Sequence, residues 1–192
     1  FIQRLSDLKI HFDALCLQET WLDYNVDPSE FAIDGYRLIL QAKSASMHGG
    51  LAIYLRTEYE HETYFSVNNS EFFESLFLKI KLDRCKHLLI GNIYRPPNNS
   101  VESLTTFFDE LSQRLSRISD NNLECAIAGD FNIDLLKLHE RTKTREYYDL
   151  LSLHGFLPKI SFPTRLSETC GIFIEKLSDT LSLRIRYDQL HS

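Results

Sequence analysis

The segment 125–132, with the sequence Cys-Ala-Ile-Ala-Gly-Asp-Phe-Asn, constrains the fold of this chain more than any other stretch. Its first four residues are small or apolar, which suits a strand that is buried on both faces. Gly129 lets the backbone turn, so Asp130 and Asn132 are expected to emerge where a substrate can reach them. An acid there can hold a divalent cation, and an amide can donate to a phosphate oxygen. An Asp/Asn turn that caps its own backbone explains the same residues equally well.

Length and composition describe one ordinary globular domain over residues 1–192. The 192 residues are enough for one sizeable core, and 43% apolar with 25% charged residues argues against disorder. No apolar run reaches the length of a membrane span, and no signal-peptide pattern is seen. Because the first residue is Phe1 rather than Met, we expect a fragment that starts inside a longer reading frame.

Charge and cysteine usage narrow the classes of partner. The net charge of −6 has the wrong sign for a broad electrostatic grip on nucleic acid, so such contact must rely on local basic patches or on a metal ion. The four cysteines form no C-x-x-C pair, which argues against a zinc site. Cys16 and Cys125 lie in apolar runs and are expected to be buried, reduced thiols.

Hydrophobic periodicity predicts more strands than helices. The expected strands cover residues 13–18, 36–40, 51–55, 59–67, 72–82, 88–94, 124–129 and 156–161. The expected helices cover residues 1–11, 101–118 and 144–154. Ser100 and Thr144 are the expected N-caps, and Gly155 is the expected stop of the last helix. The segment 170–190 has two short apolar runs and no clear period. Helices that separate groups of strands suit an α/β sandwich with mixed sheets.

Polar residues stand at the ends of three expected core strands. They are Glu19, Tyr94, and the pair Asp130 and Asn132. If the strand ends converge, Glu19 and Asp130 form a hard oxygen site that suits Mg²⁺, which takes one or two carboxylates and keeps waters. Asn132 would fix the phosphate or the attacking water, and Tyr94 would hydrogen-bond a non-bridging oxygen. For Glu19 alone, a solvated loop acid is the simpler interpretation.

Four motifs, in this order, resemble the endonuclease/exonuclease/phosphatase superfamily. They are LQET at 17–20, GGLAIY at 49–54, NIYRPP at 92–97 and GDFN at 129–132. The nearest resemblance is to the endonuclease domain of non-LTR retrotransposons, which is similar to apurinic/apyrimidinic endonucleases. FPTR at 162–165 matches a loop of those elements. The resemblance runs from about residue 1 to about residue 170.

The resemblance implies a fold and a set of roles. The fold is a four-layered α/β sandwich with two mixed β-sheets, DNase I-like, and the activity is phosphodiester cleavage with Mg²⁺ or Mn²⁺ as cofactor. Glu19 resembles the metal-binding acid and Tyr94 the active-site tyrosine. Asp130 and Asn132 resemble the aspartate that orients the nucleophilic water and its companion asparagine. The strand-end argument makes Asp130 a metal ligand instead, so both roles stay open.

The sequence departs from the family pattern at both ends, and we expect an incomplete domain. The family carries an asparagine on a strand before LQET, and that first strand is absent here. A few residues, including an Asp of the family, look deleted between Gly171 and Ile172. No terminal Ser-Asp-His follows, because 178–180 stands too early and Asp188 and His191 lack the context. Losing electrostatic groups of this kind costs a factor of about 10²–10³ each, so we expect weak activity or none.

Basic residues after GDFN offer a contact for the DNA backbone. They are Lys137, His139, Arg141, Lys143 and Arg145. A solvated loop and helix face explains this cluster at least as well. Arg95 is the better single phosphate ligand, since its planar fork matches phosphate oxygens. His48 is expected in a turn, and Trp21 is expected in packing rather than base stacking.

Three functions remain open. The first is a retrotransposon-type DNA endonuclease domain that nicks target DNA, with a reverse transcriptase domain downstream in the parent reading frame. The second is a non-catalytic remnant that binds nucleic acid or protein. The third is a phosphatase or lipid phosphodiesterase of the same superfamily, which the sequence Arg-Pro-Pro at 95–97 disfavours. We expect an intracellular monomer, in the nucleus or the cytoplasm, without membrane contact.

Overall fold

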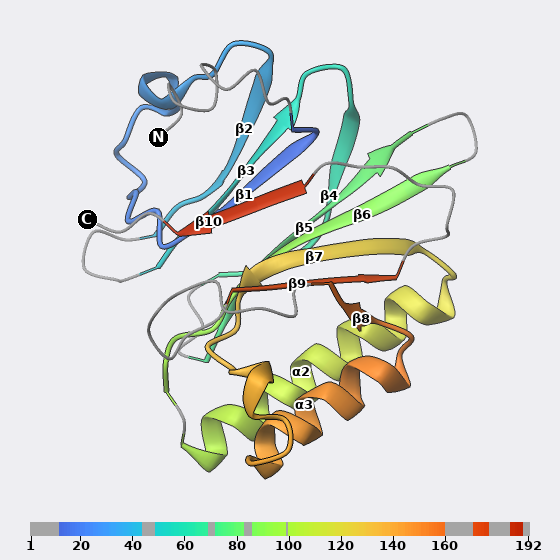
Figure 1. Ribbon diagram of the computed structural model, residues 1–192. Helices are drawn as coiled ribbons and strands as arrows, with labels where there is room; N and C mark the ends of the chain where they lie inside the picture. The colour runs from blue at the N-terminus through green and yellow to red at the C-terminus, as the bar shows by residue number, and fades with distance from the viewer. Residues whose placement is uncertain are drawn as a thin grey trace.

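Two β-sheets pack face to face, and two helices cover the outer face of the larger sheet (Figure 1). The computed structural model describes residues 12–43, 49–68, 72–82, 86–98, 100–159, 171–176 and 185–189, the last two ranges by their backbone alone. The predicted α/β sandwich of two mixed sheets is confirmed. The helix expected at 1–11 lies outside the described residues. Among the described helices, none has the length and apolar character of a membrane span.

The smaller sheet has the strand order β10-β1-β3-β2. Its strands are β1 (Ala14–Gln18), β2 (Tyr36–Gln41), β3 (Leu51–Arg56) and β10 (Ile185–Gln189). β10 runs parallel to β1, and the other neighbours are antiparallel. The 3-10 helix η1 (Pro28–Phe31) approaches the outer face of this sheet, where the Tyr54 hydroxyl donates to the Phe31 carbonyl at 2.7 Å.

The larger sheet has the strand order β4-β5-β6-β7-β9-β8. Its strands are β4 (Glu60–Val67), β5 (Glu74–Lys81), β6 (His87–Tyr94), β7 (Glu124–Asp130), β8 (Leu157–Pro158) and β9 (Gly171–Lys176). β6 and β7 are parallel because α2 (Val101–Asp120) makes the crossover between them, and the other neighbours are antiparallel. Of the strand expected over 156–161, the described part, residues 156–159, contains the two-residue strand β8.

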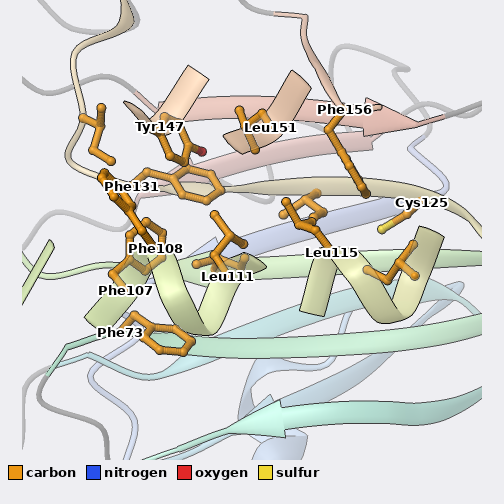
Figure 2. Close-up of a cluster of buried hydrophobic side chains, with 14 of the residues drawn as sticks. Phe73, Phe107, Phe108, Leu111, Leu115, Cys125, Phe131, Tyr147, Leu151 and Phe156 are labelled. Carbon is orange, nitrogen blue, oxygen red and sulfur yellow. The ribbon is translucent and has the colours of Figure 1, made fainter. Parts of the chain in front are cut away.

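Helix α2 buries an apolar stripe against the larger sheet (Figure 2). The stripe consists of Leu104, Phe107, Phe108, Leu111, Leu115 and Ile118. Ser100 is the predicted N-cap, and its Oγ accepts from the Ser103 amide at 3.2 Å. The N-cap prediction for Thr144 is wrong, because α3 (Thr142–Leu153) begins two residues earlier and Thr144 is buried in its first turn. Gly155 follows the last turn of α3 with a φ of +78°, as predicted.

The layer between the sheets is apolar along most of its length and polar at one end. Cys16, Ile53, Leu78 and Ile90 belong to the apolar part. Towards the ends of β1, β5, β6 and β7 the same face presents glutamine, asparagine and glutamate side chains, which are described below. Cys16 and Cys125 are buried thiols, as predicted, and burial raises the pKa of the Cys16 thiol to about 12.

Gly129 allows close packing of two neighbouring strands and does not form a turn. β7 continues through Gly129 to Asp130, so the strand does not stop at the glycine. A Cβ at Gly129 would lie 1.9 Å from the carbonyl oxygen of Ile93 on the neighbouring strand β6. The turn follows one step later, where Asn132 has a φ of +49°. The absent side chain of Gly129 therefore lets β6 and β7 approach each other beneath the site.

Candidate active site

Three buried polar side chains form a row across adjacent strands of the larger sheet. Glu74 of β5 pairs with Tyr94 of β6, and Tyr94 pairs with Asp130 of β7. Their exposed fractions are 1%, 5% and 3%. Because alternate strand residues share a face, all three point into the layer between the sheets. The parallel neighbours β6 and β7 thus end in adjacent polar groups, as predicted for Tyr94 and Asp130.

The smaller sheet delivers Glu19 to the same row. Glu19 follows the last residue of β1, and its Oε1 accepts a hydrogen bond from the Tyr94 hydroxyl at 2.5 Å. Among the described residues, Tyr94 is the hydrogen-bond partner of this carboxylate. Glu19 has a φ of +53°, a conformation that costs a non-glycine residue free energy and that is found at functional sites. Segments 75 residues apart in the chain therefore meet at one hydroxyl group.

The Tyr94 hydroxyl is held as a proton donor. Burial raises its pKa well above the ordinary value of 10, and the hydrogen bond to Glu19 and the charges of Glu19, Asp130 and Glu74 raise it further. All three carboxylates are thus close enough to act on one phenol. At neutral pH the hydroxyl is protonated and donates to an anion.

The loop that follows Asp130 is anchored on both sides of the sheet. Phe131 turns into the helix-covered core and is fully buried, with its ring 5.7 Å from that of Tyr147 (Figure 2). The backbone amide of Asn132 donates to Asp130 Oδ1 at 3.0 Å, which closes an Asx turn. The turn predicted as the structural alternative is therefore present, and it holds the Asp130 carboxylate in a fixed orientation.

Arg95 has other partners than the predicted phosphate. Its side chain is fully buried, and its guanidinium donates to three backbone carbonyls. These are Phe131 O at 2.6 Å, Asn132 O at 2.8 Å and Asn98 O at 2.6 Å. In return, the Asn132 side-chain amide donates to Arg95 O at 2.7 Å, and the Arg95 amide donates to Asp130 O at 2.9 Å. The planar fork expected to hold phosphate holds the GDFN loop in this structure.

Glu74 and Lys43 also belong to the site, although neither is among the residues predicted for it. Lys43 Nζ lies 2.6 Å from Glu74 Oε1, and the Gly50 amide donates to Glu74 Oε2 at 2.9 Å. Both side chains are buried, and burial raises the pKa of Glu74 while Lys43 and the Gly50 amide oppose the rise. A Cβ at Gly49 would clash with Glu74. Alternate residues of a strand share a face, and positions 76, 78 and 80 are apolar and buried. Glu74 continues this series, so the sequence pattern could have indicated an acid that points inward.

Two amide side chains join the sheets directly beneath the site. Gln18 Nε2 donates to Asn92 Oδ1 at 2.5 Å, and Asn92 Nδ2 donates to the carbonyls of Leu17 at 2.9 Å and Ala52 at 3.1 Å. Gln18 and Asn92 are fully buried. These bonds fix the relative position of β1 and β6, and so of Glu19 and Tyr94. Packing of one sheet on the other therefore explains why Gln18 occurs in LQET and Asn92 in NIYRPP.

The donor set fits one Mg²⁺ ion. Two carboxylates, Glu19 and Asp130, face the same phenol, and Mg²⁺ in proteins takes one or two carboxylates and completes its shell with water. Both oxygens of Glu74 are already engaged by Lys43 and Gly50. Within the described ranges, no group of three or more His, Cys, Asp or Glu residues surrounds a common point for a metal ion. A closed site such as zinc prefers is therefore not seen there.

The remaining predicted residues take varied positions. The basic cluster spans η2 (Leu135–Lys137), the turn after it and the start of α3. Lys137 on η2 lies 3.5 Å from Asp134, and Lys143 on α3 pairs with Glu146 at 2.6 Å. Trp21 is 57% exposed and is therefore not a core residue. His48 and the segments 162–165 and 178–180 lie outside the described residues. The backbone of Asp188 pairs with that of Leu17 in β1.

Comparisons with known proteins agree with this architecture. The model of the Endonuclease/Exonuclease/phosphatase family matches residues 1–165. The AP endonuclease LMAP from Leishmania major has a TM-score of 0.66 at 14% identity, over 91% of this chain and 72% of that chain. The human Nocturnin catalytic domain with bound sulfate anion has a TM-score of 0.62 at 14% identity, with the same coverages.

A mannosyl-6-phosphatase from Bacteroides thetaiotaomicron is also similar in structure. It has a TM-score of 0.60 at 15% identity, over 91% of this chain and 74% of that chain. At these identities the likeness establishes the fold and not the substrate. No curated protein sequence matches the chain significantly.

Proposed function

The chain belongs to the endonuclease/exonuclease/phosphatase family, and from this premise we propose that it is a metal-dependent phosphodiesterase that cleaves DNA. The observation that carries the proposal is the Tyr94 hydroxyl, which binds Glu19 from one sheet and faces Asp130 on the other. A buried, protonated phenol between carboxylates has a clear use when an anionic phosphate and a cation enter together. The structural neighbours include an AP endonuclease, which supports the choice of substrate.

Each residue has a proposed role. Glu19 holds the divalent cation, Mg²⁺ or Mn²⁺, which would polarise a phosphoryl oxygen and stabilise charge on the leaving oxygen. Tyr94 orients Glu19 through its single hydroxyl proton, and it would turn that proton to a non-bridging oxygen of the phosphate once the cation engages Glu19. Asp130 either orients the attacking water or shares the cation with Glu19. Asn132 binds the phosphate through the second N–H of its amide, since the first is engaged by Arg95 O.

Arg95 acts as a positioning residue in this proposal rather than as a phosphate ligand. Its three bonds to carbonyls of the loop and of Asn98 hold Asn132 in its left-handed conformation and Asp130 in its Asx turn. Without these bonds the loop would have several conformations, and only some of them would aim Asp130 at the phosphate. Such preorganisation is a large part of catalysis by fixed polar groups.

A plasmid-nicking assay tests the proposal. The full chain is incubated with supercoiled DNA in Mg²⁺, in Mn²⁺ and in EDTA, beside Asp130→Asn and the matched control Asp109→Asn, an exposed acid on α2. We expect metal-dependent nicking that Asp130→Asn reduces about 10²–10³-fold and Asp109→Asn leaves unchanged. Nicking that Asp130→Asn does not affect, or no nicking at any metal concentration, contradicts the proposal.

One observation favours a second candidate. The described residues place the carboxylates of Glu19 and Asp130 at the site, but they contain no group of three or more His, Cys, Asp or Glu residues that could hold a metal ion. This favours a non-catalytic module that binds nucleic acid or protein on the same fold. DNA binding without nicking would support this candidate over the first.

We also propose a retrotransposon origin for the domain, which the NIYRPP and FPTR motifs support. A reverse transcriptase domain would then follow in the parent reading frame, and the domain would act as a monomer in the nucleus or the cytoplasm. Sequencing the parent transcript beyond residue 192 tests this origin. A reading frame without polymerase motifs would contradict it.

A further inference from the structure

Two aromatic side chains stand exposed beside the candidate site. Trp21 is 57% exposed and Tyr24 is 63% exposed, although large aromatic side chains are usually well buried. Trp21 is two residues from Glu19, so their Cα atoms are at most about 7.6 Å apart, from the fixed spacing of 3.8 Å between consecutive Cα atoms. The aromatic surface therefore adjoins the carboxylate that we assign to the cation.

The backbone beneath these rings is fixed by hydrogen bonds. The amides of Thr20 and Trp21 donate to the carbonyls of Gly50 at 3.2 Å and Gly49 at 3.0 Å. On the other side, the Lys43 amide donates to Leu22 O at 3.1 Å. Trp21 also has a φ of +57°, a conformation that a tryptophan adopts at a cost in free energy. The segment thus holds an indole towards solvent on a backbone tied to the site.

Tyr24 is oriented by a separate contact. Its hydroxyl accepts a hydrogen bond from Asn68 Nδ2 at 3.3 Å, while its ring is exposed. Because the hydroxyl of Tyr24 is held in place and its ring is exposed, the ring is suited to stacking on a ligand. The side chain loses little conformational entropy when the ligand binds. Both rings belong to the same short segment after Glu19.

Charge does not supply the affinity that a nucleic-acid ligand needs. The chain has a net charge of −6, Arg95 is buried among carbonyls, and Lys143 of the basic cluster pairs with Glu146. Proteins that hold single strands combine charge with base stacking, and every base has a face on which an aromatic ring can stack. In this chain stacking has to carry the larger share.

We propose that Trp21 and Tyr24 form a stacking platform for unpaired bases next to the scissile phosphate. This inference rests on the proposed function for the position of the phosphate, and it adds a substrate class: single-stranded or locally unpaired nucleic acid. Duplex DNA with all its bases stacked is a poorer ligand, because its bases present no free face to the indole. The platform also predicts tolerance of base identity, since stacking reads no hydrogen-bond pattern.

The single tryptophan of the chain makes the test direct. Tryptophan emission of the full chain is followed during titration with an octamer of deoxythymidylate in EDTA, and with an abasic octamer that has the same number of phosphates. We expect quenching by the thymidylate octamer and none by the abasic octamer. A plot of log affinity against log salt concentration should have a shallow slope, of about −1 to −2, because few phosphates are neutralised.

Variants separate the platform from general surface effects. Fluorescence polarisation of a labelled octamer should show binding about 5- to 100-fold weaker in Trp21→Ala and in Tyr24→Ala. Trp21→Phe, which keeps a ring, should recover part of the loss. Leu153→Ala changes an apolar side chain that is 80% exposed at the far end of α3, and it should bind as the wild type does.

The outcomes distinguish this inference from the proposed function. Equal quenching by the abasic octamer, or wild-type affinity in Trp21→Ala, overturns the platform even if the chain nicks DNA. Base-dependent quenching in a chain that nicks no DNA in any metal supports the platform and overturns the proposed phosphodiesterase.

Discussion

At the scale of single residues, the Tyr94 hydroxyl is the group that connects the two sheets at the site. It donates to Glu19, and its pKa is raised by burial and by three carboxylates, so it stays protonated through the neutral range. The hydroxyl group thus lies at a fixed place, and its single proton can pass from Glu19 to an incoming anion by rotation about the C–O bond.

Tyr94→Phe removes the hydroxyl group and keeps the ring. We expect nicking to fall about 10²–10³-fold, because one preorganised donor is lost and Glu19 is no longer oriented. Tyr59→Phe is the matched control, since Tyr59 also donates to a carboxylate, Asp13 Oδ1 at 2.9 Å, outside the site. Nicking rates of both variants give the test, and an equal loss in both would mean that the effect is structural.

Arg95→Lys tests the positioning role. A lysine ammonium cannot reproduce a planar fork, so carbonyls of the GDFN loop lose their donors at a cost of roughly 1–3 kcal/mol each. We expect kcat to fall with little change in KM, and the Asn132 amide to exchange its hydrogen faster. Arg56→Lys, at an exposed arginine that pairs with Glu58 at 3.0 Å, is the control. A raised KM with unchanged kcat would instead support direct contact between Arg95 and substrate.

Sequence reasoning reached some residues of the site and not others for physical reasons. Glu19, Tyr94 and Asp130 end strands, where a polar residue after an apolar run is visible in the sequence. Lys43 and Glu74 were missed, because a buried ion pair is recognised by the contact of its partners and the two are 31 positions apart (74 − 43). The exposure of Trp21 was also missed, since it depends on a left-handed backbone that the residue type disfavours.

At the scale of elements, the parallel pair β6 and β7 places the site, and Gly129 lets the two strands approach. Most strands and helices were predictable, because their apolar periodicity is regular. The first residue of α3 and the short length of β8 within residues 156–159 were not predictable, because caps and edge pairing depend on neighbours far away in the chain.

Gly129→Ala should destabilise the fold strongly. The new methyl group would lie 1.9 Å from Ile93 O, a backbone atom that moves only with β6, so we expect a loss of about 3 kcal/mol or more in urea unfolding. Gly35→Ala is the control: it has a φ of +82° but no atom within 4 Å of the new Cβ, so about 1 kcal/mol is expected. Equal losses would show that β6 yields easily and that the close approach is unimportant.

At the scale of the whole molecule, a polar layer replaces the apolar layer where the two sheets meet at the site. The ion pair of Lys43 and Glu74 lies in this layer, next to the amide contact between Gln18 and Asn92. Breaking a buried pair leaves an uncompensated charge, whereas an exposed pair contributes little. The layer thus couples stability to the charge of the site.

Lys43→Met should reveal this coupling as a dependence on pH. We expect a loss of about 3–5 kcal/mol at pH 8, because Glu74 is left buried and charged. The pKa of Glu74 is already raised by burial and should rise further without Lys43, so the protonated form is favoured by folding. The stability that protonated Glu74 contributes is therefore fully present below the pKa of Glu74 in the unfolded chain. It is lost as pH rises through the pKa of Glu74 in the folded chain, so the loss of stability in Lys43→Met is smaller at pH 5.

Urea unfolding at pH 5 and pH 8 measures that difference. Lys81→Met, at an exposed lysine that lies 2.7 Å from Glu60, is the control and should change little at either pH. A defect in Lys43→Met that is the same at both pH values would exclude Glu74 as the titrating group.

Manganese binding to the full chain tests the central claim most directly, namely that Glu19 of one sheet binds a single cation beside Asp130 of the other. We predict one Mn²⁺ per chain, an affinity at least about tenfold lower in Glu19→Gln, and an unchanged affinity in Glu62→Gln, an exposed acid on β4. A loss in Asp130→Asn would make Asp130 a ligand, and retained affinity would leave it the water-orienting role. Binding by Glu19→Gln equal to that of the wild type, or no binding by the wild type, would contradict the account.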